Sequence, residues 1–418
     1  MDRAPDQRIT GTVGQEICLR ENIKAMMTGQ IAPLGSRYVL TLNAVNCATG
    51  DSLAREQVEA ASKEEVLSAL GSAASRLRGK LGESLASIEA LDTPLEQATT
   101  TSLQALKALS LGDAKRAQGP ETDSIPFYRR VLELDPNFAL AYARLGTIYG
   151  NIGEREQAEE FRRKAFELRD RVSERERLYI TAHYYTSVTF EIEKARQTYE
   201  LWTQTYPRDS TPRNNLGAIY GQLGRPERAL TEFQEALRLN PREEMHYRNV
   251  AGTFLTLNRL EEAKAVAQRQ LAELGESTTT HVFLYRIAAA QGDHAAMERH
   301  VAGVEGSAAE ADLLGARAEA ALFVGKLAEA RRLSRQQVEL RQRQGLNELA
   351  ASIIAGQGGA EALVGNRPEA RTLAREALAM DRGITVLFGA TVALVMAGDA
   401  DQAEKLFQQW SPRVAAAP

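Results

Sequence analysis

Cysteine is scarce in this chain: among its 418 residues, Cys18 and Cys47 are the two present. Two thiols do not make the disulfide framework of a small secreted domain, and they cannot supply the four ligands of a structural zinc site. No C-x-x-C motif marks a redox pair. A helix packed on a hairpin could bring the two together, but we expect buried, apolar cysteines in a reducing, cytoplasmic protein.

Residue sets for metal binding and catalysis are also missing. The histidines are His183, His246, His281, His294 and His300. The last two are six residues apart, so on a helix they share no metal-binding face. No Walker loop, G-x-S-x-G or H-E-x-x-H motif is present, and no His-Arg-Asp or Asp-Phe-Gly triplet of a kinase. We therefore expect no enzyme activity, no metal and no cofactor.

Charge and hydropathy exclude further classes of function. The formal charge of -4 at pH 7 gives no electrostatic reason to bind nucleic acid or an anionic membrane. The first ten residues, MDRAPDQRIT, lack the apolar core of a signal peptide. The longest uncharged apolar run, residues 384–398, is shorter than the roughly 20 residues that span a bilayer. We expect a soluble protein without a membrane partner.

Helical hairpins are what the sequence does contain. In residues 214–241, NNLGAIYGQLGRPERALTEFQEALRLNP, apolar residues recur at helical spacing on both sides of Gly224. Small residues at three positions let the two helices approach closely. In a 34-residue frame that starts at Ser210, the residues at positions 7, 8, 11, 20, 24, 27 and 32 are Leu216, Gly217, Tyr220, Ala229, Phe233, Ala236 and Pro241.

The same frame returns along the chain. Leu145, Gly146, Tyr149, Ala158 and Ala165 fit an earlier copy, and Val250, Ala251, Phe254 and Ala263 fit a later one. The turn, position 15, falls at Gly153, Phe190, Gly224, Asn258, Gly292, Gly325, Gly365 and Gly398. The steps between these turns are 37, 34, 34, 34, 33, 40 and 33 residues. This pattern resembles the tetratricopeptide repeat.

The resemblance implies a mainly α fold, an α-solenoid wound as a right-handed superhelix. A single hairpin cannot bury its own apolar face, so consecutive copies must stack. We expect about eight repeats over residues 139–418 and a linker with an irregular repeat-like hairpin over residues 93–138.

A concave groove for a peptide is the second implication of the resemblance. In the family, positions 2, 5, 6, 9 and 12 face this groove or its rim, and larger residues at 4, 7, 11 and 24 fill the space between repeats. Asn and Arg side chains suit an extended peptide, although the alternative is that they merely solvate the groove. The candidate peptide-binding residues are Arg144, Thr147, Tyr184, Asn214, Asn215, Arg248 and Asn249.

Residues 1–92 do not fit the repeat frame. We expect a helix over residues 10–29, a β-hairpin over residues 36–62 that turns at Thr49-Gly50-Asp51, and an amphipathic helix after it. The segment GQEICLRENIKAMMTGQIAPLGSRYVLTLNAVNCATGDSLA resembles the second half of a TolB-like α/β domain. In bacterial signalling proteins that domain lies between a serine/threonine kinase or a winged-helix domain and tetratricopeptide repeats. The opening strand and helix have no counterpart here, so we expect an incomplete α/β domain.

Two features of the C-terminal repeats stand apart. Gly356, Gly358 and Gly359 lie inside a predicted helix, which indicates either close packing or a break, or else a flexible joint. The last repeat has no polar capping helix, so Phe407 and Trp410 are candidates for contact with another chain, such as a homodimer partner.

Two hypotheses for function follow. The first is a non-enzymatic scaffold that binds a protein or peptide in its concave groove. The second is a regulatory or sensory fragment of a bacterial serine/threonine kinase or transcriptional regulator. A longer reading frame upstream of Met1 would favour the second.

Overall fold

The structure, a computed structural model, describes residues 11–20, 23–84, 100, 102–118, 120–307 and 309–415. The chain divides into two compact units, one of Met1–Ile148 with Lys164–Arg177 and one of Tyr149–Arg163 with Leu178–Pro418. Most of the expected junction between the α/β domain and the linker, residues 85–99, lies outside the described residues.

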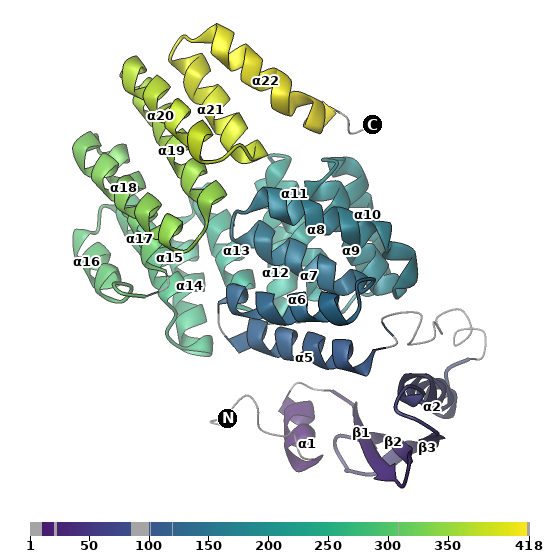
Figure 1. Ribbon diagram of the computed structural model, residues 1–418. Helices are drawn as coiled ribbons and strands as arrows, with labels where there is room; N and C mark the ends of the chain where they lie inside the picture. Colours follow the sequence, from purple (N-terminus) through teal and green to yellow (C-terminus); the bar gives the residue numbers. More distant parts are fainter. Residues whose placement is uncertain are drawn as a thin grey trace. The chain divides into compact units, whose positions relative to one another are not determined.

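The first unit begins with a small α/β region. Helix α1 (Gly11–Arg20) precedes an antiparallel sheet in the order β1 (Ala25–Leu34), β2 (Arg37–Asn46) and β3 (Ser52–Ala60), and helix α2 (Val66–Lys80) packs on one face (Figure 1). The core between sheet and helix contains Leu42, Ala44, Ala54, Ala73 and Leu77. The expected hairpin of β2 and β3 is confirmed, with Gly50 at a positive φ of 78° in its turn.

The predicted helix over residues 10–29 is wrong from Ala25 onward, because Ala25–Leu34 forms strand β1. This strand pairs with β2 in register from Ala25 opposite Asn46 to Leu34 opposite Arg37. A two-residue turn at Gly35 and Ser36 joins the strands, and Gly35 has a φ of 61°. Thr28 and Gly29 are weak helix formers, so pairing along the whole of β2 outweighs local helix propensity.

The cysteine prediction is also wrong. Cys18 of α1 and Cys47 after β2 form a disulfide, with their Cα atoms 5.8 Å apart. Backbone hydrogen bonds hold the two segments together, from Ile23 to the Cys18 carbonyl and from Cys47 to the Lys24 carbonyl. Their proximity depends on the missed strand β1, which leads the chain from α1 directly to the end of β2.

Helix pairs make up the rest of the described chain. Helices α5 (Leu103–Gln118) and α6 (Ile125–Leu134) pair across the short helix η1 (Glu121–Ser124). Eight pairs follow (Figure 1): α7 (Ala139–Asn151) and α8 (Arg155–Glu167); α9 (Glu174–Ser187) and α10 (Ile192–Thr205); α11 (Ser210–Gln222) and α12 (Pro226–Leu239); α13 (Glu244–Thr256) and α14 (Leu260–Leu274); α15 (Thr278–Gln291) and α16 (His294–Ala302); α17 (Glu310–Phe323) and α18 (Leu327–Arg343); α19 (Asn347–Leu363) and α20 (Arg367–Met380); α21 (Ile384–Met396) and α22 (Ala400–Ala415). The predicted α-solenoid with a small α/β region before it is confirmed.

The turns between paired helices lie where the repeat frame predicts them. All eight turn residues have positive φ, including the two that are not glycine, Phe190 at 56° and Asn258 at 57°. At Gly224 the N–H of Arg225 donates to the carbonyl of Tyr220 at 2.9 Å, which closes the end of α11. This is the backbone bond by which a left-handed residue ends a helix, so glycine suits most of these positions.

The glycines of α19 lie in one continuous helix, so the helix is not broken. A Cβ atom at Gly358 would lie 3.2 Å from the carbonyl oxygen of Ala370 and 3.3 Å from the Cβ of Ala393. The absence of a side chain at Gly358 therefore lets α19 pack closely on α20 and α21, which supports the packing interpretation at that position. The long step at this repeat reflects long helices, since α18 and α19 have 17 residues each.

Candidate functional site

The predicted groove residues are divided between the two units. Arg144 and Thr147 belong to the first unit, where Arg144 lies 3.3 Å from the Asp113 carboxylate and the Thr147 hydroxyl donates to the Ala143 carbonyl at 3.0 Å. The other five residues belong to the second unit. Tyr184, on α9, is half-buried and its ring lies 6.1 Å from that of Tyr185.

The three asparagines form a chain of hydrogen bonds between α11 and α13. The Asn249 amide donates to Asn214 at 2.7 Å, and the Asn214 amide donates to Asn215 at 3.2 Å. Asn214 is 5% exposed. These side chains therefore join consecutive repeats, and Asn215 and Asn249 keep only part of their surface for a ligand.

Arg248 is the most accessible of the central candidates. It lies exposed on α13, one residue before the asparagine that bonds to α11. Within the described residues, neither an ion pair nor a hydrogen bond engages its guanidinium group. The sequence frame places it at position 5, so it is the groove candidate with the most capacity to bind.

Beside Arg248 lies a small pocket of about 10 Å³, room for about one water molecule. Three helices of two consecutive repeats form it: α13, α14 and α15. The lining residues are Glu244, Arg248 and Ala251 from α13, Ala267 and Gln270 from α14, and Thr279, Thr280 and Phe283 from α15. Three of these, Arg248, Thr279 and Phe283, stand at groove positions 5, 2 and 6 of the repeat frame.

Two buried polar side chains of the pocket have atoms without a hydrogen-bond partner in the described structure. Gln270 and Thr280 are each 3% exposed, and the Gln270 Nε2 and Thr280 Oγ1 atoms make no hydrogen bond. Glu244 is held in place, since its Oε1 accepts a hydrogen bond from the Ser277 hydroxyl at 2.7 Å. Buried polar groups usually have hydrogen-bond partners, so these two atoms distinguish the pocket from the packed core around it.

Sequence reasoning missed the pocket, although a signal was present. Position 24 carries Tyr199 and Phe233 in the two preceding repeats, but Ala267 in this one. Position 27 carries Ala236 in the preceding repeat, but Gln270 here. A small residue where the frame requires a large one, followed by a polar residue where it requires a small one, predicts a hollow with a polar wall.

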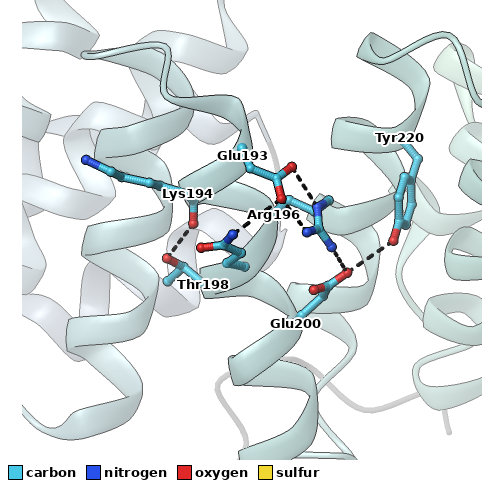
Figure 2. Close-up of polar contacts among 7 residues, drawn as sticks. Glu193, Lys194, Arg196, Thr198, Glu200 and Tyr220 are labelled. Atoms are coloured by element: carbon cyan, nitrogen blue, oxygen red, sulfur yellow. Dashed lines mark hydrogen bonds and ion pairs between the residues drawn. The ribbon is translucent and has the colours of Figure 1, made fainter. Parts of the chain in front are cut away.

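Another polar group of the second unit is fully paired. Figure 2 shows Arg196 of α10 between Glu193 and Glu200, with the Tyr220 hydroxyl of α11 donating to Glu200 at 3.2 Å. The hydrogen bonds to Glu193 raise the pKa of Arg196. Because each charge has its partner, this network joins consecutive repeats and offers no unpaired group to a ligand.

Two of the histidines contact each other. His281 Nδ1 lies 3.0 Å from His300 Nδ1, and His281 Nε2 lies 2.6 Å from the Glu276 carboxylate. Burial lowers the pKa of His300. Across the described residues, no group of three or more His, Cys, Asp or Glu side chains is placed to hold a metal ion.

The last helix pair carries the predicted contact residues. The Phe407 and Trp410 rings lie 5.0 Å apart at a steep angle, and Phe388 of α21 lies 5.4 Å from Trp410. Trp410 is half-buried and donates its Nε1 hydrogen to the Thr391 hydroxyl at 3.2 Å. Phe407 and Phe388 are exposed.

Comparison with known proteins identifies the repeat. Two family models described as tetratricopeptide repeat match residues 127–160 and 212–243. The chain therefore carries tetratricopeptide repeats, and proteins with this repeat generally mediate protein–protein interactions. No curated protein matches the chain. In the described parts of the chain, no helix is both long and apolar enough to cross a membrane.

Solved structures that match the chain include the following three. PilF of Pseudomonas aeruginosa is 22% identical with a TM-score of 0.33, over 48% of this chain and 90% of its own. PilW, a type IV pilus biogenesis factor, is 17% identical with a TM-score of 0.36, over 49% and 93%. The Cut9–Hcn1 hetero-tetramer of the APC/C is 14% identical with a TM-score of 0.48, over 84% and 64%.

Proposed function

We propose that the chain is a non-enzymatic scaffold that binds a peptide or protein segment in the groove of its tetratricopeptide repeats. The exposed, unpaired guanidinium of Arg248 at a groove position carries this proposal, because an exposed cation beside a polar pocket suits the polar groups of an extended peptide. Asn215, Asn249 and Tyr184 are half-buried and would add contacts, whereas Asn214 positions its neighbours. Arg144 and Thr147 are retained as contacts in the first unit.

The test is a pulldown from source-cell lysate, read by mass spectrometry, with the native chain and two matched variants. Arg248→Glu reverses the charge in the groove. Arg335→Glu makes the same change on α18, where Arg335 is exposed and outside the groove positions. We expect a partner that the native chain and Arg335→Glu retain, and that Arg248→Glu loses by about tenfold or more. Equal recovery by both variants would contradict binding through the groove.

Two further properties belong to this proposal. Phe407 and Trp410 form a homodimer contact through the last repeat, supported by the exposed Phe407 and Phe388 rings. The cytoplasmic location stays part of the proposal, although the Cys18–Cys47 disulfide removes the cysteine argument for it.

A second candidate is a regulatory or sensory module of a kinase or transcriptional regulator. One observation favours it: Met27 and Ile31 of β1 lie opposite the core residues Ala44 and Leu40 of β2, yet they are 62% and 55% exposed. Helix α2 covers the strands β2 and β3 on this face and leaves β1 open, as expected for part of a larger TolB-like α/β domain. A kinase or DNA-binding domain encoded upstream in the same reading frame would support it.

A further inference from the structure

We propose that Arg162 of α8 binds the carboxylate of an aspartate or glutamate side chain in the bound peptide. The inference rests on the proposed function, since it names a side chain that the groove selects. It also adds to the groove a charged residue from a B helix, which the repeat frame does not place among the groove positions.

Arg162 occupies a position where the next two repeats carry an aromatic ring. It is position 24 of its repeat, and the residues at this position in the following repeats are Tyr199 and Phe233, both buried. Tyr179 and Tyr199 of the next repeat are near enough to act on the charge of the guanidinium group. A cation therefore lies between helices, in a place that those repeats fill with a ring.

The positive charge of Arg162 is not balanced inside the described part of the chain. Its Nε atom is buried and makes no hydrogen bond, and no ion pair engages the guanidinium group. The carboxylate one turn earlier on α8, Glu159, is bound by Arg163 instead, with a nitrogen–oxygen distance of 2.5 Å. Arg155 adds a second positive charge, and burial lowers the pKa of Arg162. Because a buried charge is costly without an opposite charge beside it, an incoming anion would stabilise this site.

The absence of a side chain at Gly150 lets the guanidinium group reach the groove side of α7. A Cβ atom at Gly150 would lie 2.4 Å from Nη2 of Arg162 and 3.2 Å from its Cζ. Gly150 is position 12 of the repeat frame, one of the positions at the groove or its rim. The groove candidate Asn215 lies next to the Tyr199 hydroxyl, which in turn is near Arg162. Arg162 is half-buried rather than fully enclosed, so a ligand in the groove can reach it.

A carboxylate is the group that a single guanidinium recognises best. Two parallel N–H groups of the guanidinium donate to the two carboxylate oxygens, and the opposite charges cancel. A carboxamide of the same shape brings one acceptor oxygen and an NH₂ group, so it leaves the charge of Arg162 uncompensated. The site should therefore distinguish glutamate from glutamine, and aspartate from asparagine.

The experiment selects peptides from a random twelve-residue library displayed on phage, with the full chain as bait. Selected sequences are then made as synthetic peptides with the acidic residue kept, changed to its amide, or changed to phosphoserine, and also with a C-terminal amide. Arg162→Tyr supplies the ring that Tyr199 gives the next repeat, and Gly150→Ala occupies the place of the guanidinium while Arg162 remains. Arg335→Tyr, at an exposed arginine of α18, is the matched control. Thermal melts check that all three variants fold.

We expect the native chain and Arg335→Tyr to enrich peptides with Asp or Glu at one position. Changing that residue to its amide should weaken binding about tenfold. Arg162→Tyr should abolish this preference while melting no lower than the native chain, because it removes an unpaired charge, and Gly150→Ala should reduce the preference. Enriched peptides without an acidic preference, the same preference in Arg162→Tyr, a dependence on the C-terminal carboxylate instead, or tighter binding of phosphoserine would overturn the assignment and leave groove binding in place. If the native chain enriches no peptide, the proposed function fails together with this inference.

Discussion

Two buried glutamates hold together residues that are distant in the sequence. Glu348 of α19 is 2% exposed, and its carboxylate accepts a hydrogen bond from the N–H of Glu156, 192 residues away, at 3.0 Å. Glu154 accepts in turn from the backbone of Glu348 and Leu349. Each carboxylate thus caps the first turn of the other's helix, α8 or α19, where backbone N–H groups lack partners.

This reciprocal cap is sensitive to pH. Burial, with smaller contributions from Asp381 and Glu154, raises the pKa of Glu348 to about 7, and burial also raises the pKa of Glu154. Between the ordinary glutamate pKa and about 7, Glu348 is therefore protonated in the folded protein and ionised in the unfolded chain. Stability must therefore fall as the pH rises from the ordinary value toward 7, and stay lower above it.

We predict that Glu348→Gln stabilises the protein at pH 8 by about 1 kcal/mol, a figure reduced for solvent screening. The amide keeps an oxygen for the Glu156 N–H and removes the buried charge beside Glu154 and Asp381. Thermal melts at pH 5, 6 and 8, with hydrogen exchange at the start of α8, measure the effect. The exposed Glu339, changed to Gln, is the control and should follow the native profile. If the melting temperature of the native chain does not change between pH 5 and pH 8, the protonation of Glu348 has no effect on stability and the prediction is wrong.

At the scale of elements, the sequence predicts the structure best where a single residue is enough to determine the local backbone conformation. Position 15 of the repeat needs a left-handed backbone, so glycine marks six of its eight occurrences and the spacing extends the prediction to Phe190 and Asn258. Strand β1 was not predictable in this way, because its ten residues form a strand only when β2 pairs with them. The pocket beside Ala267 was predictable in part. Ala267 and Gln270 differ from the residue types that the repeat frame requires, but only the packed helices show that a space remains between them.

The disulfide links α1 to the end of β2, whereas the core of this region lies between the sheet and α2. The Cys18–Cys47 bond closes a loop of sequence separation 29, and α1 makes few other contacts with the sheet. We predict that Cys18→Ser lowers the stability of α1 and β1 by about 3 kcal/mol, the amount expected for a loop of this length. Hydrogen exchange with and without dithiothreitol measures the loss of protection there, while α11 and α12 should not change.

The control for this prediction is a double variant, Cys18→Ser with Cys47→Ser. Its exchange should be fast in α1 and β1 and unaffected by dithiothreitol. Equal protection of these elements in the reduced native chain would show that packing alone holds them, and that the disulfide has no part in their stability.

At the scale of the whole chain, the repeat pattern predicts which helices are neighbours but not which distant ones meet. Within the second unit, consecutive pairs from α10 onward pack on one another, as α19 does on α21, and this follows from the frame. The bond between Glu156 and Glu348 does not follow, because it depends on rotations between repeats that accumulate over many pairs. The groove candidates show the same limit: the frame names Asn214, but its burial against Asn249 depends on how two particular repeats pack.

The last helix pair leads to a prediction about assembly. Phe388, Val395 and Phe407 are exposed on α21 and α22, the last described helix pair. We predict that the chain is a dimer at about 20 μM and that Phe407→Ser makes it monomeric, because a two-fold contact loses the same ring from both partners. Sedimentation velocity over a range of concentrations measures this.

Phe407 is the residue to change, because Trp410 also packs into the core of its own repeat and its loss would confuse folding with assembly. Phe323→Ser is the matched control, since Phe323 of α17 is more exposed than Phe407 but lies two repeats earlier. A native chain that sediments as a monomer throughout, or a Phe323→Ser variant that dissociates as Phe407→Ser does, would contradict a dimer built on the last repeat. If Phe407→Ser alone dissociates, the exposed rings of α21 and α22 hold two chains together.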